Sequence, residues 1–269
     1  VRRILEAKIE LGLFDHPYVD DARLEAVKAQ APQFKAAARV AAERSVVLLR
    51  NSGGLLPLSK TAYTHVAVIG PLGDGKSDTL GPWVFAQDLD ETITLTHGLR
   101  DKLGANVQVD YAQGVQIRRQ LPSPFEMIAK EKTPAIWDAT QTKVELDKAM
   151  ALAASADLIV MALGEKQDMI GESASRSSLE LPGDQQKLLE AVIALGKPVV
   201  LVLFNGRPLN ITWANDHVPA ILEAWYPGTE GGAAIANVLV GDVSPGGKLP
   251  FSWARNAGQV PIYYAHNNT

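Results

Sequence analysis

The segment Asp157–Pro182 reads DLIVMALGEKQDMIGESASRSSLELP, an unbroken apolar run followed by a long polar loop. A continuous apolar run bounded by polar residues is typical of a fully buried strand, most often one of a parallel sheet. In open parallel sheets, ligands bind beyond the carboxyl ends of the strands. The loop carries Glu165, Glu172 and Arg176 at that position, so we expect one of its carboxylates to be able to act as an acid or a base.

Runs of the same apolar or β-branched kind recur and predict a sheet. The predicted strands are His65–Gly70, Asn106–Tyr111, Asp157–Leu163, Pro198–Phe204 and Ala220–Trp225, with Ser45–Asn51 as an extra strand or a helix end. Helical patterns fall at Leu95–Gly104, Thr142–Ser155, Leu181–Gly196 and Thr229–Gly241. Strands that alternate with helices predict a parallel sheet covered on both faces. The expected fold is therefore α/β, a three-layer α/β/α sandwich with a mostly parallel sheet of five or six strands.

The ends of the chain differ from its middle. Residues 1–44 have mostly helical patterns, whereas residues 242–269 form a turn-rich strip without a predicted helix. The chain opens inside a helical pattern, with neither an initiating Met nor a signal peptide, so we expect a fragment of a longer protein. The segment Leu121–Pro134 is predicted to be a mobile excursion.

Composition excludes several classes of partner. The 269 residues are 46% apolar and 21% charged, which is ordinary for a globular domain with a sizeable core. A net charge of −4 argues against nucleic-acid and membrane partners, because both surfaces repel an acidic protein. The absence of cysteine and the wide scatter of the five histidines predict no metal site. No apolar run is long enough to span a bilayer.

The segment Gly70–Ser77, GPLGDGKS, matches the phosphate-binding pattern G-x-x-x-x-G-K-[ST] directly after a predicted strand. That chemistry also needs a helix beginning at Lys76, whose N-terminus would face the phosphate. Gly81 and Pro82 follow too soon for such a helix. We therefore expect a glycine-rich loop here, and a nucleotide site only as the alternative.

Several residues near the predicted strand ends have either a structural or a functional interpretation. Trp83 is either core or a stacking platform at the sheet edge. Glu172 is either a solvated surface charge or a catalytic carboxylate, and Arg176, four residues later, predicts a local ion pair worth at most about 1 kcal/mol. Arg207 lies in a strand-to-helix turn and is expected to pin a neighbouring loop. Gly231 and Gly232 are expected to let a helix pack close to the sheet.

Longer stretches of the chain resemble a known family. The segments Ala156–Val192, Gly196–Ile211 and Ala220–Trp253 together resemble the C-terminal α/β sandwich domain of glycoside hydrolase family 3, and in particular that of bacterial periplasmic β-glucosidases. The opening Val1–Asp20 resembles the helix that leaves the N-terminal (β/α)8 barrel of that family. The closing Gln259–Thr269 resembles the strap that leads toward its fibronectin-III-like domain.

The resemblance implies a domain order. Residues 1–36 would be linker helices leaving a missing barrel, residues 37–255 the α/β sandwich domain, and residues 256–269 the strap toward a missing third domain. It also implies a periplasmic or secreted protein, a retaining hydrolase of β-linked glucosides that needs no cofactor and no metal. Its partners would be a β-glucoside or a short β-linked oligosaccharide and the barrel of the same protein.

The resemblance further assigns roles to residues of this chain. Glu172 matches the general acid/base, with Glu165 as the fallback because the loop carries both carboxylates. Trp83 matches the tryptophan on the aglycone side, and Arg176 is expected to bind substrate. In that family the nucleophilic aspartate comes from the barrel, so it would be absent here and the chain would be inactive alone. Ala174 and Ser175 replace the Asp and Tyr that often precede the arginine, which weakens the register of the loop slightly.

Two other interpretations stay open. The chain could be a stand-alone nucleotide- or carbohydrate-binding α/β domain that uses the loop Gly70–Ser77. It could also be an inert scaffold with a sticky exposed surface.

Overall fold

The computed structural model describes residues 1–18, 20–84, 88–118, 135–263 and 265. The predicted mobile excursion Leu121–Pro134 lies outside the described residues. The chain divides into two compact units, Val1–Ala37 and Ala38–Thr269. The first unit contains α1 (Arg2–Glu10), α2 (Asp21–Lys28) and the start of α3 (Ala31–Ser45), and neither α1 nor α2 buries a residue.

The second unit is built on a six-stranded sheet with the order β1-β6-β5-β4-β2-β3. The strands are β1 (Val47–Asn51), β2 (His65–Ile69), β3 (Gln108–Ala112), β4 (Leu158–Gly164), β5 (Val199–Phe204) and β6 (Ala220–Glu223). All neighbouring pairs are parallel except β1 with β6, which is antiparallel. This confirms the predicted mostly parallel sheet, and the extra strand predicted near Ser45–Asn51 is β1.

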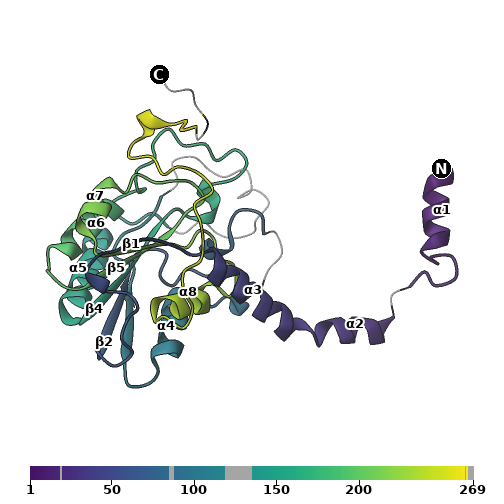
Figure 1. Cartoon of the computed structure of the whole chain (residues 1–269), viewed down its shortest axis with the longest axis horizontal. Coiled ribbons are helices and arrows are strands. Elements are labelled where there is room, and N and C mark those ends of the chain that lie inside the picture. The colour runs from purple at the N-terminus through teal and green to yellow at the C-terminus, as the bar shows by residue number, and fades with distance from the viewer. Residues whose placement is uncertain (19, 85–87, 119–134, 264, 266–269) are drawn as a thin grey trace. The chain divides into compact units, whose positions relative to one another are not determined.

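Helices cover both faces of the sheet (Figure 1). They are α4 (Leu95–Leu103), α5 (Ala139–Ser155), α6 (Gln185–Ile193), α7 (Thr212–His217) and α8 (Gly231–Leu239). Side chains alternate between faces along each strand, so Val66 and Val68 pack toward α4 and α8, whereas Ala67 and Ile69 pack toward α5, α6 and α7. Every residue of β4 and β5 is buried, as continuous apolar runs require. The predicted three-layer α/β/α sandwich is confirmed.

Helix boundaries follow local chemistry. The helix α5 starts three residues before the predicted Thr142, because the side chain of Asp138 caps the backbone N–H of Gln141 at 2.7 Å. The helix α6 starts later than the predicted Leu181, at Gln185, because Gly183 adopts a φ of +68° that a helix cannot contain. Residues 242–263 contain only one short helical turn, Ala257–Gln259.

Glycines let α4 and α8 approach one another. A methyl group on Gly98 of α4 would lie 2.2 Å from the carbonyl oxygen of Gly232, and one on Gly232 would lie 1.9 Å from that of Thr94. The expectation that Gly231 and Gly232 let the helix pack close to the sheet is therefore corrected for both. Gly232 packs against the segment that begins α4, and a methyl on Gly231 would meet the ring of Pro227.

The strand order reverses direction between β2 and β4, at the carboxyl ends of these two strands. From β2 the chain moves outward to β3, and it then returns to β4 on the other side of β2. The loops that leave the carboxyl ends of β2 and β4 therefore diverge at a topological switch point, where open α/β sheets bind their ligands. Trp83 follows β2, and Glu165 and Glu172 follow β4, so the fold brings the predicted site residues to this point.

The described part of the chain has neither a membrane-spanning helix nor a cluster of metal-ligating side chains. Each helix in it is too short or too polar to pass through a membrane. No group of three His, Cys, Asp or Glu side chains there could hold a metal ion.

The close approach of α4 and α8 can be tested at Gly232. We expect Gly232→Ala to lower the free energy of unfolding by about 3 kcal/mol or more, since the clash is with backbone atoms that cannot rotate away. Gly246→Ala is the matched control, because the nearest atom to the added methyl there is 3.9 Å away. We expect it to change stability by less than about 0.5 kcal/mol. Equal unfolding midpoints of the two variants in urea would contradict the packing argument.

Candidate active site

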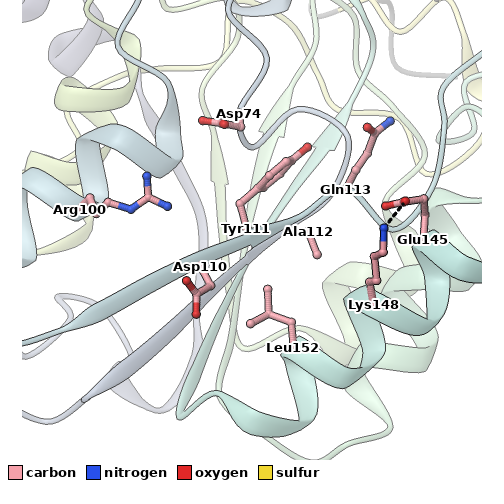
Figure 2. A pocket seen from close by; sticks show the side chains of 9 residues that line it. All are labelled: Asp74, Arg100, Asp110, Tyr111, Ala112, Gln113, Glu145, Lys148 and Leu152. Carbon is pink, nitrogen blue, oxygen red and sulfur yellow. Dashed lines mark hydrogen bonds and ion pairs between the residues drawn. The ribbon is translucent and has the colours of Figure 1, made fainter.

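A polar hollow of about 720 Å³ lies beside the edge strand β3 (Figure 2). Side chains from β3, α4 and α5 line it together with Asp74 of the loop after β2. The pKa of Tyr111 is raised there because the phenol is buried and because the carboxylates of Asp74, Asp78 and Glu145 oppose its ionisation. Of the residues predicted for catalysis or binding, only Asp74 of the alternative binding loop Gly70–Ser77 lines this hollow; Trp83, Glu165, Glu172 and Arg176 lie outside it.

The loop after β4 presents Glu172 at the tip of a tight turn. Its neighbours Gly171 and Ser173 have φ values of +96° and +58°, and the N–H of Ala174 donates to the carbonyl of Gly171 at 3.3 Å. Met169 and Ala174 are buried, whereas Glu172 is exposed. A non-glycine residue in the left-handed region, such as Ser173, costs about 1–3 kcal/mol and is characteristic of functional sites. The turn thus exposes a carboxylate beyond the carboxyl end of β4.

Trp83 lies against the same turn. A methyl group on Gly171 would be 3.1 Å from Cβ of Pro82 and 3.6 Å from Cζ2 of Trp83. The tryptophan is 56% exposed, so it is not a core residue. The turn that carries Glu172 and the loop that carries Trp83, about 90 residues apart in the sequence, therefore lie against each other.

Two side chains tie these loops to each other. The amide nitrogen of Gln167, oriented to satisfy its hydrogen bonds, donates to the carbonyls of Ser77 and Gly81 at 2.9 Å each. The hydroxyl of Tyr226 donates to the carbonyl of Lys166 at 3.3 Å, and a methyl on Gly81 would contact Cβ of the same tyrosine. Sequence analysis singled out neither residue, because only the fold shows which loops they join.

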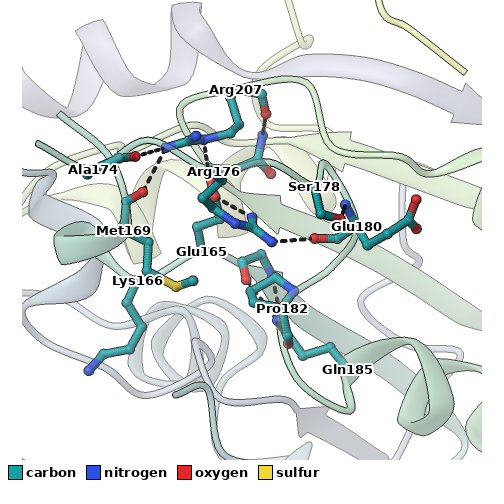
Figure 3. A network of polar contacts seen from close by, with 12 residues as sticks. Glu165, Lys166, Met169, Ala174, Arg176, Ser178, Glu180, Pro182, Gln185 and Arg207 are labelled. Atoms are coloured by element: carbon teal, nitrogen blue, oxygen red, sulfur yellow. Dashed lines mark hydrogen bonds and ion pairs between the residues drawn. The ribbon is translucent and has the colours of Figure 1, made fainter. Parts of the chain in front are cut away.

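Glu165, the fallback acid/base, is a buried ion-pair partner (Figure 3). Its side chain is 0% exposed. One carboxylate oxygen accepts from Nη1 of Arg176 at 2.6 Å, and the other accepts from Nε of Arg207 at 3.1 Å. Two guanidinium groups thus compensate the charge of one carboxylate, as burial of an ion requires.

Arg207 also closes the turn that carries Glu172. Its Nη2 donates to the carbonyl of Met169 at 2.7 Å and to that of Ala174 at 3.0 Å. These residues stand on either side of the tip, so one nitrogen spans its neck, as Figure 3 shows. The expectation that Arg207 pins a neighbouring loop is met by these contacts.

The predicted local ion pair between Glu172 and Arg176 is replaced by a longer-range one. Arg176 donates to Glu165 and, through Nη2, to the carbonyl of Glu180 at 2.9 Å. A buried carboxylate attracts the guanidinium more strongly than an exposed one, because the solvent screens the latter. The substrate contact expected of Arg176 stays a prediction.

A second buried carboxylate, Glu223, ends β6 at the same edge. It accepts the N–H of Trp225 at 2.8 Å and the amide of Asn205 at 3.0 Å. Burial nevertheless raises its pKa well above the usual value, and the charge of Glu165 adds to that effect. Sequence analysis missed it, although a glutamate inside the apolar run AILEAW was a visible signal.

The loop Gly70–Ser77 lacks the geometry of a phosphate cradle. No helix begins at Lys76; a short helical turn occupies Asp78–Leu80 and ends at Gly81. The ammonium group of Lys76 donates to Asp90 at 2.6 Å. This agrees with the expectation of a glycine-rich loop and disfavours the nucleotide alternative.

Comparison with known proteins gives consistent matches. Residues 46–269 match the family model of the glycosyl hydrolase family 3 C-terminal domain. The chain is 39% identical, over 100% of its length and 35% of the relative, to a periplasmic β-glucosidase of Salmonella typhimurium (strain LT2). It is 36% identical, over 97% of its length and 34% of the relative, to a β-xylosidase of Formosa agariphila.

Solved structures agree with these matches. The crystal structure of a β-glucosidase from Listeria innocua in complex with isofagomine superposes with a TM-score of 0.78 at 33% identity. It covers 99% of this chain and 34% of that one. The chain thus spans about a third of the length of the relatives it matches.

The raised pKa of Glu223 predicts that the free energy of unfolding depends on pH. Because its folded pKa is raised, the folded state binds more protons than the unfolded state from about pH 4.5 up to that pKa. Stability should therefore fall as pH rises through this window, by up to about 1.4 kcal/mol per pH unit. We expect Glu223→Gln, which cannot ionise, to remove this slope.

The measurement is urea unfolding of both proteins between about pH 5 and pH 8, where the stability of the variant should rise relative to the parent. Parallel pH profiles would show that Glu223 ionises normally.

Proposed function

Because the chain belongs to glycosyl hydrolase family 3 and corresponds to its C-terminal domain, we propose that it supplies the general acid/base of a retaining β-glucosidase. The substrate would be a terminal β-D-glucosyl residue of a β-glucoside or short β-linked oligosaccharide. Glu172 is the proposed proton donor, and Trp83 forms part of the aglycone subsite.

One observation supports this assignment above others: Glu172 is exposed in a turn at the switch point of the sheet, and its neighbour Gly171 lies against Trp83. Of the two carboxylates that the loop offers, Glu165 has no exposed side-chain surface and both its oxygens are engaged by arginines. A general acid must reach the proton acceptor to within about 3 Å. The exposed carboxylate of Glu172 is open to such an approach, whereas the enclosed carboxylate of Glu165 is not.

The chemistry needs a second carboxyl group about 5–5.5 Å from the first. That group attacks the anomeric carbon while Glu172 protonates the departing oxygen. Glu172 then takes a proton from the water that releases the sugar. We propose that the nucleophile is an aspartate of an N-terminal barrel of the same protein, since this chain spans about a third of its relatives. Arg176 is proposed to contact substrate.

The first unit of the chain has an exposed apolar surface that a neighbouring domain could cover. Its helices expose large apolar side chains that a folded partner would cover: Ile4, Leu5, Ile9, Leu24, Val27 and Phe34. We propose that residues 1–36 link to the barrel, that residues 37–255 form the sandwich domain, and that residues 256–269 lead to a third domain. The periplasmic β-glucosidase among the relatives supports a periplasmic or secreted location.

The role of Glu172 is tested by Glu172→Ala in the longer enzyme that contains this chain. Turnover of phenyl β-glucoside, which has a poor leaving group, should fall about 10²–10⁴-fold. Azide should restore turnover of 2,4-dinitrophenyl β-glucoside, because it attacks the glycosyl-enzyme without needing a general base. Glu190→Ala, at an exposed carboxylate of α6, is the control and should keep full activity. Unchanged hydrolysis of phenyl β-glucoside by Glu172→Ala would exclude the assignment.

The proposal that the nucleophile lies outside this chain is tested with purified residues 1–269. We expect purified residues 1–269 to give no release of 4-nitrophenol from its β-glucoside, since no partner carboxylate would be present to form the glycosyl-enzyme. Circular dichroism confirms that the sample is folded. Turnover that persists in an independently purified Glu172→Ala sample would be contamination, whereas turnover that Glu172→Ala abolishes would show that the chain contains its own nucleophile.

A further inference from the structure

We propose that the buried Glu165–Arg207 pair is a positioning device that holds Glu172 in place for proton transfer. This inference rests on the proposed function of Glu172. It gives the fallback carboxylate a different role: Glu165 acts on the reaction through Arg207 and the turn, and it does not touch substrate.

The contacts form a continuous chain from the sheet to the turn. The backbone N–H of Glu165 donates to the carbonyl of Phe204 at 2.8 Å, so its backbone is held to the end of β5. Its carboxylate accepts a hydrogen bond from Nε of Arg207 at 3.1 Å, and this bond orients the planar guanidinium. Nη2 of that group then reaches the carbonyls of Met169 and Ala174. The position of the neck of the turn therefore depends on the carboxylate below it.

The turn needs such a restraint because its own geometry is unfavourable. Ser173, next to Glu172, has a φ of +58°, which is costly for a residue with a side chain. Within the turn, the contact between the N–H of Ala174 and the carbonyl of Gly171 is long, at 3.3 Å. Without Arg207 the chain would relax toward common backbone conformations and move Glu172 from its position in the turn.

The backbone on the other side of the turn supports the same arrangement. A methyl group on Gly206 would lie 2.1 Å from Cδ1 of Ile170, so the residue before Arg207 packs against the turn itself. The amide of Asn205 donates to the carbonyl of Arg207 at 2.9 Å and holds the backbone from which the guanidinium extends. Both ends of the arginine are thus anchored.

The chain offers a matched control in which the same chemistry serves packing. Arg39 of α3 donates from Nε and Nη2 to one carboxylate oxygen of Glu230, at 2.8 and 2.6 Å. Glu230 is buried and precedes α8. Arg39→Lys therefore perturbs a pair with a buried glutamate that lies outside the turn and its neck.

The first experiment measures kcat/KM of the longer enzyme for two aryl β-glucosides. Arg207→Lys keeps the charge but loses the fork that serves Glu165 and both carbonyls. We expect kcat/KM to fall about 10–100-fold for phenyl β-glucoside, which needs acid assistance, and less than about threefold for 2,4-dinitrophenyl β-glucoside, which does not. Glu165→Gln should give the same pattern, and Arg39→Lys should affect neither substrate. Equal losses on both substrates would mean a structural role only and would overturn the proposal.

The second experiment is a double-mutant cycle with Glu172→Ala, measured with 2,4-dinitrophenyl β-glucoside and with phenyl β-glucoside. If Arg207 acts through Glu172, Arg207→Lys should have no further effect once the glutamate is gone. An additional loss as large as in the parent enzyme would overturn the proposal.

A third measurement is independent of activity. Hydrogen exchange of the peptide that covers residues 169–174 should become at least about tenfold faster in Arg207→Lys and stay unchanged in Arg39→Lys. Unchanged exchange in Arg207→Lys would overturn the proposal whatever the kinetics show. If Glu172→Ala keeps its activity on phenyl β-glucoside, the proposed function fails, and this exchange result alone decides whether Arg207 holds the turn.

Discussion

A single buried carboxylate, that of Glu165, organises the edge of the sheet on which the candidate site is built. Its ionised form is tolerated because Arg176 and Arg207 each bind one of its oxygens. Removing one partner from a buried ion pair commonly costs about 3–5 kcal/mol, since the other charge is left in a medium of low polarity. The two arginines are held in turn to backbone carbonyls, so the charge at the end of β4 determines the course of the loop beyond it.

The same edge shows how a stable scaffold can display an exposed functional group. The strands β4 and β5 are wholly buried, and the close helix pair α4 and α8 covers one of their faces. The buried carboxylates of Glu165 and Glu223 lie where strands end, and each is hydrogen-bonded, because burial without partners would be unfavourable. The carboxylate of Glu223 is less well compensated than that of Glu165. Its pKa is raised because its two hydrogen bonds do not fully offset the effect of burial. Glu172, by contrast, extends into solvent on a turn whose ends are buried.

Much of the fold was predictable from the residues alone. Continuous apolar runs identified the strands, including Asp157–Leu163, because full burial on both faces leaves no room for polar alternation. Predictions failed where a contact joins distant segments. Arg176 was expected to pair with Glu172, its neighbour in the loop, but a buried carboxylate is the stronger partner. Gly232 was expected to face the sheet, whereas the carbonyl of Thr94, more than a hundred residues away, is what excludes a side chain there.

The sequence by itself determined the sheet, the family and the two carboxylates between which a choice had to be made, since these depend on local patterns and on motifs in order. Only the tertiary structure showed how the surroundings of these two carboxylates differ. Burial, charge compensation and the identity of the nearest loop are properties of three-dimensional neighbours, which the spacing of residues does not specify. Glu165 and Glu172 are seven positions apart and chemically identical, yet one is enclosed between two guanidinium groups and the other is exposed to solvent.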